Sequence, residues 1–352
     1  MHMSDALLSP AVGGMMWAAS AGLAFHSARR VEPEMESRLP LMGVLGAFTF
    51  AAQMINFTIP LTGSSGHFAG GLLLAVLLGP RAGFLTMAAI LVIQALFFAD
   101  GGLLALGCNL FNMGFFPCFV AYPLIYRPIL RAGKESPGRI VLASVAAAVL
   151  GLQLGAFGVV AETKLSGISA LPFGTFVLLM QPIHLAIGLV EGLATAAIVS
   201  FVRKAGPEIL QETGGGGWQK ARVKGFLPGL FLAALALGGV ASWFASTHPD
   251  GLEWSVLHAA GREDLGTPKG LHAFLDGIQR RSAFFPDYGL KTSVPAGGAA
   301  AGGERWPKVD PGTSAAGILG AALTLGLTAA LGAGLRVVRR RRRVPHPAPP
   351  AG

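Results

Sequence analysis

The chain has 352 residues, of which 52% are hydrophobic and only 13% are charged, and its formal net charge is +9. With a mean hydropathy of +0.58, this composition excludes an ordinary soluble globular protein and is typical of an integral membrane protein. The basic residues lie at the ends of apolar runs and in the tail, at 339–343. Lipid head groups and membrane orientation account for this placement better than nucleic-acid binding does, so we expect no nucleic-acid partner.

The chain opens with the residues MHMSDALLSP, which differ from a removable signal segment. A secretory signal has a basic start, an apolar core and a small-residue cleavage site. Here the first basic residue after His2 is His26. We therefore expect the first residues to be kept.

Apolar stretches that suit a bilayer-crossing helix of about 20 residues recur along the chain. Eight of them lie near residues 9–28, 40–59, 83–99, 102–126, 140–161, 173–202, 226–246 and 314–337. A shorter one, 66–80, is bracketed by Gly63 and Pro80, which predicts a short or discontinuous helix whose irregular end is buried or lines a wet cavity. The sequence therefore predicts an all-α polytopic membrane protein with about nine passes.

Lys and Arg residues predict the orientation of these passes, because positively charged loops stay in the cytoplasm. If the N-terminus is outside, the inside segments hold 19 of the 27 Lys and Arg residues, and the short outside loops hold only Lys164. The other seven lie in one long outside segment, 247–313, to which the rule applies weakly. The distribution predicts an outside N-terminus and an inside C-terminus.

A glycine-rich and then basic stretch, TGGGGWQKARVKG at 213–225, predicts a flexible linker between two modules. Seven passes precede it and two follow it, and the tail is polar and rich in proline, as in disordered segments. The predicted organisation is a membrane domain at 1–205, a linker at 206–225, a two-span module with an external segment at 226–338, and a basic disordered tail at 339–352.

The first two residues offer three nitrogen ligands in sequence, namely the α-amine of Met1 and the backbone amide and imidazole of His2. These atoms close fused chelate rings, and metal binding releases their protons. A planar, nitrogen-rich site suits Ni(II) or Cu(II) better than Zn(II) or Mg(II). His67, in TGSSGHFAGG at the outside end of the short helix, is the candidate fourth ligand. The alternative is that both histidines only form hydrogen bonds.

Three stretches carry a resemblance to a known family: MHMSDALLSP with Trp17 after it, GSSGH at 63–67, and PFGTFVLLMQPIHLAIGLVEG at 172–192. They resemble the CbiM/NikM family, the substrate-capture components of energy-coupling-factor ABC transporters for cobalt and nickel. The resemblance covers about 1–205. It implies a bacterial cytoplasmic (inner) membrane protein that works with a transmembrane coupling subunit and two cytoplasmic ATPase subunits.

In that family the metal is held by the N-terminal amine, by the amide and side chain of a second-position histidine, and by a later histidine. The resemblance therefore implies that Met1, His2 and His67 hold the transported ion, Ni(II) or Co(II), and that no resident cofactor is needed. From Met3 onward, the N-terminal sequence departs from the family's usual His-Ile-Pro-Asp-Gly motif. This departure leaves the choice between cobalt and nickel open.

The stretch HPDGLEWSVLH, 248–258, resembles the Pro-Asp-Gly-Leu-Glu motif of the small two-span companion subunit of the same transporters. Two interpretations of His248, Asp250 and Glu253 are open. They could assist metal loading, or they could form a turn with a hydrogen-bonded aspartate, which we favour.

Polar residues within the apolar runs need partners, because unpaired polar groups are costly in a bilayer. They could orient the ligand histidines or hold helices together through hydrogen bonds, which is the interpretation we favour for most of them. They are Gln53, Asn56, Gln94, Asn109, Asn112, Gln153, Gln181, His184 and Glu191.

We therefore predict a metal-capturing transporter subunit that is not an enzyme. The competing prediction is a self-sufficient divalent metal permease, which should keep a path of carboxylates or histidines across the bilayer midplane. Asp100 and Glu162 lie near the predicted outer ends of passes, and only Glu191 is predicted as an interior charge.

Overall fold

The computed structural model describes residues 1–31, 39–133, 136–206, 220–261, 269–291 and 306–342. The first part of the chain forms α1 (Pro10–Arg30), α2 (Leu39–Gln53), α3 (Gly71–Leu78), α4 (Pro80–Ile93), α5 (Leu106–Leu110), α6 (Arg127–Arg131), α7 (Pro137–Ser166) and α8 (Phe173–Ala205). Two π-helical segments extend these helices, η3 (Gln94–Phe98) after α4 and η4 (Phe111–Tyr126) between α5 and α6.

The second part of the chain forms α9 (Lys220–Gly239), α10 (Gly251–Ala260), α11 (Leu271–Ser282) and α12 (Pro311–Arg342). Short 3-10 turns lie at Asp5–Leu7, Ala241–Phe244 and Pro286–Tyr288. Of the predicted linker, residues 207–219 lie outside the described residues, as do 262–268 and 292–305 of the predicted external segment and 343–352 of the predicted tail. Helix α12 continues into the first residues of that tail.

Five helical segments of the described chain are long and apolar enough to cross a membrane. They are Pro80–Phe98, Leu106–Arg131, Pro137–Ser166, Phe173–Ala205 and Pro311–Gly334. Two shorter apolar helices are Leu39–Gln53 and Phe226–Gly239. The protein is therefore a helical, multi-pass membrane protein, while the count of nine passes and the orientation of the termini stay predictions.

Residues with capping preferences lie at both ends of the long helix α7. The Ser136 side chain accepts the Arg139 backbone N–H at 3.3 Å, and Pro137 occupies the first helical position of α7, where its missing N–H costs nothing. Gly167 ends α7 with a left-handed φ of 64°. These residues confine α7 to the span that its apolar composition requires.

Helices α7 and α8 pack along each other through small residues. A Cβ atom placed on Gly188 would lie 2.9 Å from Val149 Cα, so the two backbones approach closely at that point. The Gln153 side chain donates to the Gln181 carbonyl at 2.8 Å, and the Gln181 side chain donates to the Gln153 carbonyl at 3.3 Å. For these two glutamines, the prediction of interhelical hydrogen bonds is confirmed.

The apolar run at 40–59 does not form one helix, so that part of the prediction was wrong. Helix α2 ends at Gln53, and β1 (Asn56–Ile59) pairs antiparallel with β2 (Ser64–His67). Residues from the second part of the chain bond to both strands: Ser246 N–H donates to the Asn56 carbonyl at 2.7 Å, and Ser65 N–H donates to the Pro249 carbonyl at 2.8 Å. Residues distant in the sequence thus provide hydrogen-bond partners for the extended backbone of the hairpin. Local hydropathy cannot reveal such partners.

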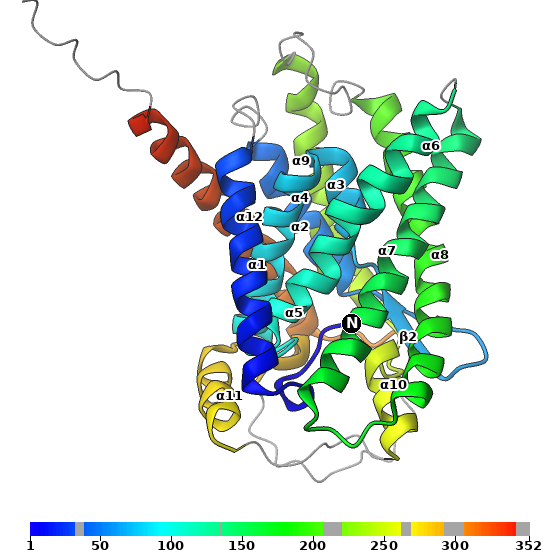
Figure 1. The fold of residues 1–352 in the computed structure, drawn as a ribbon. Helices are drawn as coiled ribbons and strands as arrows, with labels where there is room; N and C mark the ends of the chain where they lie inside the picture. Colours follow the sequence, from blue (N-terminus) through cyan, green and yellow to red (C-terminus); the bar gives the residue numbers. More distant parts are fainter. Residues whose placement is uncertain (32–38, 134–135, 207–219, 262–268, 292–305, 343–352) are drawn as a thin grey trace, which may run out of the picture.

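The stretch predicted as a short or discontinuous helix, 66–80, contains the end of β2 and then the eight-residue helix α3, which confirms a short helix. The N-terminus, β2, α10 and α11 lie at one end of the bundle, whereas α6 and the start of α9 lie at the other (Figure 1). Helices α9 and α12 pack against α2 and against each other, so the second part of the chain extends the bundle.

Candidate metal centre

Backbone hydrogen bonds hold the first residues of the chain in an extended conformation inside the bundle. Met3 N–H donates to Asn109 Oδ1 at 2.7 Å, and the Met3 carbonyl accepts from Asn109 Nδ2 at 3.2 Å and from Gly102 N–H at 2.8 Å. The Asp5 carboxylate accepts the Ala105 N–H at 2.9 Å. The predicted intramembrane Asn109 therefore fixes the register of the residue that follows His2.

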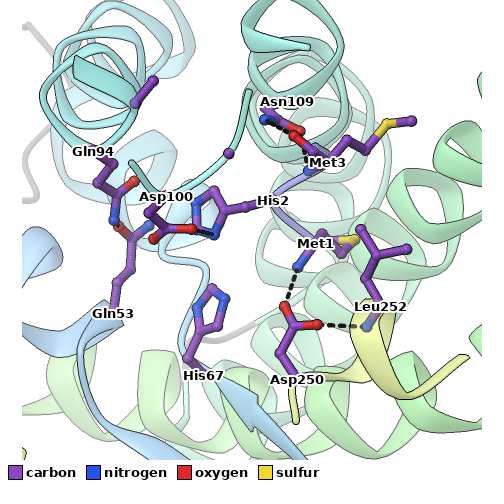
Figure 2. Close-up of polar contacts among 12 residues, drawn as sticks. Met1, His2, Met3, Gln53, His67, Gln94, Asp100, Asn109, Asp250 and Leu252 are labelled. Carbon is purple, nitrogen blue, oxygen red and sulfur yellow. Dashed lines mark hydrogen bonds and ion pairs between the residues drawn. The ribbon is translucent and has the colours of Figure 1, made fainter. Parts of the chain in front are cut away.

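The α-amine of Met1 faces the carboxylate of Asp250. Its nitrogen lies 3.4 Å from Asp250 Oδ2, and the Met1 side chain is only 3% exposed (Figure 2). Asp250 Oδ1 accepts the Leu252 and Glu253 N–H groups, both at 2.8 Å, and so caps α10. Burial by itself would raise the pKa of Asp250, but the ammonium beside it holds that pKa below its ordinary range.

Asp250 therefore both caps α10 and pairs with the N-terminal amine. The predicted hydrogen-bonded aspartate is present, as a helix cap completed by Glu253, whose side chain accepts the Asp250 N–H at 3.0 Å. The contact between its second oxygen and the N-terminal amine was not predicted.

The imidazole rings of His2 and His67 lie one above the other. Their centroids are 5.3 Å apart and their planes differ by 10°. Burial, with the N-terminal ammonium next in importance, lowers the pKa of His2 to about 3 and that of His67 to about 4. Both rings are therefore neutral at physiological pH, which is the form that binds metal ions.

A chain of hydrogen bonds connects His2 to the segment that carries His67. His2 Nδ1 lies 3.1 Å from Asp100 Oδ1, and the Tyr288 hydroxyl donates to Asp100 Oδ2 at 2.5 Å. Gln94 Nε2 lies 3.2 Å from that hydroxyl and donates to Gln53 Oε1 at 2.8 Å. Gln53 Nε2 in turn donates to the carbonyl of Ala69, two residues after His67, at 2.8 Å. The two glutamines therefore help to position this site, as one interpretation of the sequence predicted.

Helix α8 holds the same segment from the opposite side. The Glu191 carboxylate accepts the Ala69 N–H at 2.9 Å and the Gly70 N–H at 3.2 Å, at the start of α3. A carboxylate suits this place because the first N–H groups of a helix carry partial positive charge. The predicted interior charge thus has a structural partner.

Two glycines let the hairpin and the start of α10 approach α8. A Cβ atom on Gly66 would lie 2.5 Å from Ile187 Cγ1, and one on Gly251 would lie 2.5 Å from Ile183 Cγ2. Close to these contacts, His184 of α8 lines a small cavity of about 10 Å³ together with Met1, His67 and Asp250. This volume is about that of a single bound water or ion.

The three predicted ligand residues therefore lie around one place, with Asp250 and Asp100 beside them (Figure 2). Within the described part of the chain, no group of three or more His, Cys, Asp or Glu side chains has the arrangement of a metal site. Sequence reasoning missed Tyr288 and the contacts of Asp100, and only the Asp-x-x-Glu spacing at Asp250 signalled a helix cap.

Comparisons with known proteins give a consistent picture. Residues 2–209 match the family model for the cobalt uptake substrate-specific transmembrane region, CbiM, and residues 224–337 match the PDGLE domain. An Archaeoglobus fulgidus protein named "Putative fused nickel transport protein NikMN" is 34% identical over 340 residues, covering 94% of this chain and 98% of that protein. The cobalt transport protein CbiM of Sorangium cellulosum is 32% identical, covering 60% and 94%. A crystal structure of a truncated transition metal transporter, 31% identical, aligns with a TM-score of 0.50 and covers 58% of this chain and 99% of the other.

Acidification from pH 7 to pH 5 should remove stability that the metal-free protein gains from keeping His2 and His67 neutral. A histidine in the unfolded chain takes up a proton near its ordinary pKa of 6.5, whereas His2 and His67 stay neutral down to pH values of about 3 and about 4. The unfolded state binds more protons than the folded state in this window. Each histidine therefore lowers the free energy of unfolding by up to about 1.4 kcal/mol for every pH unit of acidification. Thermal unfolding in detergent at a series of pH values measures this slope.

The variant His67→Asn removes one of the two groups and should make the slope shallower. His248→Asn is the matched control, because His248 is exposed and lies outside the site. Equal slopes for the wild type and His67→Asn would show that His67 is not held neutral by the fold.

Proposed function

Because the chain belongs to the CbiM family of cobalt-uptake membrane proteins and carries a PDGLE domain behind it, we propose that it is the ion-capturing subunit of an energy-coupling-factor importer, with its companion subunit fused on. Its substrate is Ni(II) or Co(II). A transmembrane coupling subunit and two cytoplasmic ATPases complete the importer in a bacterial cytoplasmic membrane. The sequence has no G-x-x-x-x-G-K-[ST] motif, in keeping with ATP hydrolysis by a partner.

The proposed ligands are the Met1 amine, the His2 amide nitrogen, His2 Nδ1 and His67. The observation that carries this assignment is the 5.3 Å stacking of the two imidazoles beside the buried amine. With the amide nitrogen, the amine closes a five-membered chelate ring and Nδ1 closes a six-membered one, and three such nitrogen atoms lie in one plane. His67 then occupies the fourth corner, an arrangement that Ni(II) favours.

The carboxylates beside the ligands prepare the site for this ion. Asp250 faces the charged amine, and Asp100 accepts a hydrogen bond from Nδ1 of the neutral His2 ring, so the two carboxylates fix the amine and the ring in place before the ion binds. The neutral His2 ring carries its proton on Nδ1 while it donates to Asp100, so this proton must move to Nε2 or leave before Nδ1 can bind the ion, and the contact with Asp100 is then lost. The two carboxylates then offset the charge of the ion from outside its ligand shell.

Two residues added ahead of Met1 should abolish high-affinity Ni(II) binding. The addition converts the amine into an amide and moves His2 out of chelate register. Isothermal titration calorimetry on the purified full chain compares the extended and native forms, and the expected loss of affinity is at least about 100-fold, or roughly 2.7 kcal/mol.

His67→Ala should leave a three-nitrogen fragment that binds the ion more weakly than the wild type and more strongly than the extended form. Gly14→Ala, on α1 where an added Cβ meets nothing within 4 Å, is the matched control for handling and folding. Equal affinities for the native and extended forms would place the metal site elsewhere.

Uptake of radioactive nickel by cells should require the partner subunits. Cells that produce this chain together with a coupling subunit and its ATPases should accumulate the ion, and cells that produce the chain alone should stay near background. Strong uptake by the chain alone would instead support the self-sufficient permease. The contacts of Glu191 with two backbone N–H groups speak against its service as a free carboxylate in such a permease.

A further inference from the structure

A large cavity opens beside the proposed metal site, at the end of the bundle that holds α10 and α11. Its volume is about 1110 Å³. Its wall contains six carboxylate side chains, from Asp5, Asp100, Asp250, Glu253, Asp276 and Asp287. The basic or titratable nitrogen side chains of the same wall are those of Lys269, His2 and His272.

The cavity joins the protein surface to the proposed ligands. Glu253, Lys269 and Asp287 are exposed and form its rim. At its inner end lies His2, whose side chain is only 6% exposed and whose Nε2 is a buried nitrogen with no hydrogen-bond partner. A buried imidazole nitrogen without a partner is costly unless something polar reaches it. The inner end of the cavity therefore presents a polar nitrogen atom, His2 Nε2, that lacks a hydrogen-bond partner.

The charges of the wall are only partly balanced within the protein. Asp276 pairs with Arg280 at 2.7 Å, and Asp250 pairs with the Met1 amine. Glu253 and Asp287 at the rim and Asp100 near His2 leave negative charge along the path. A cleft lined by one sign of charge, with walls of low dielectric constant, concentrates ions of the opposite sign and raises association rates by about 10- to 1,000-fold.

We propose that this cavity is an electrostatic vestibule, which gathers hydrated divalent transition-metal ions and leads them to His2. The proposal rests on the proposed function and adds the route by which the substrate arrives. An ion with six waters needs about 180 Å³, at roughly 30 Å³ for each water, and so fits within the cavity. The carboxylates bind the hydrated ion loosely through its waters, and the ion loses those waters only at the nitrogen ligands.

Most of the carboxylates in this wall belong to the second part of the chain. Asp250, Glu253, Asp276 and Asp287 come from the PDGLE domain, whereas Asp5 and Asp100 come from the CbiM region. The fused domain therefore supplies charge that acts on the rate of capture, apart from any effect on the ligands. Steering of this kind changes association and leaves dissociation nearly unchanged.

The experiment measures Ni(II) association with the full chain in detergent by stopped-flow absorption of the nickel–nitrogen complex, at low and at high salt. The test variant is the double substitution Glu253→Gln with Asp287→Asn. Glutamine keeps an acceptor for the capping box at Asp250, and asparagine tolerates the left-handed backbone of residue 287, whose φ is 50°. Both charges are thus removed with little change of shape.

The double variant should bind Ni(II) about three- to tenfold more slowly at low salt, with the difference vanishing at high salt because ions screen the rim charges. Its dissociation rate should equal that of the wild type. Lys269→Gln removes a positive charge from the rim and should speed association. Lys164→Gln is the matched control, because Lys164 is exposed on α7 and does not line this cavity.

Equal association rates for the wild type, the double variant and Lys269→Gln would overturn the vestibule while leaving the metal site intact. A faster dissociation in the double variant, with unchanged association and therefore a lower equilibrium affinity, would likewise overturn it. A wild-type chain that fails to bind Ni(II) at all would contradict the proposed function instead, and the vestibule would fall with it.

Discussion

An ammonium group taken out of water is tolerated only when an opposite charge faces it. The Met1 amine meets this condition through Asp250, which lies 249 residues away along the chain. The same carboxylate caps α10, so the start of the chain and the PDGLE segment are fixed by one side chain. Removing one partner of such a buried pair would leave the other charge uncompensated, at a cost of about 3–5 kcal/mol.

The rest of the site follows from this anchoring. With Met1 and Met3 fixed, His2 has little freedom except rotation of its side chain, and Asp100 holds that ring over His67. The hydrogen bonds from Asp100 through Tyr288, Gln94 and Gln53 to Ala69 tie the two histidines into one polar network. Such a network holds ligands at useful distances before any ion arrives, which lowers the reorganisation that binding requires.

The sequence was informative where the physics is local and uninformative where partners are distant. Long apolar runs predicted α7 and α8, because a bilayer sets helix length and composition. Chelate chemistry and the family resemblance together singled out Met1, His2 and His67, which the structure brings together.

By contrast, the sequence predicts residues 56–59 as the end of a helical pass, whereas they form one strand of a hairpin. The backbone partners that hold this hairpin come from residues 246–249, so no local pattern reveals it. Likewise, nothing near Asp100 in sequence indicates Tyr288, 188 residues later.

X-ray absorption spectroscopy of the Ni(II)-loaded full chain measures the ligands of the bound ion. We expect a single shell of four nitrogen ligands, with scattering from two imidazole rings and the edge feature of planar Ni(II). A shell that contains carboxylate oxygen atoms, or six ligands in octahedral geometry, would mean that Asp250 or Asp100 binds the ion itself. That result would contradict a site built from the amino end of the chain and two histidines.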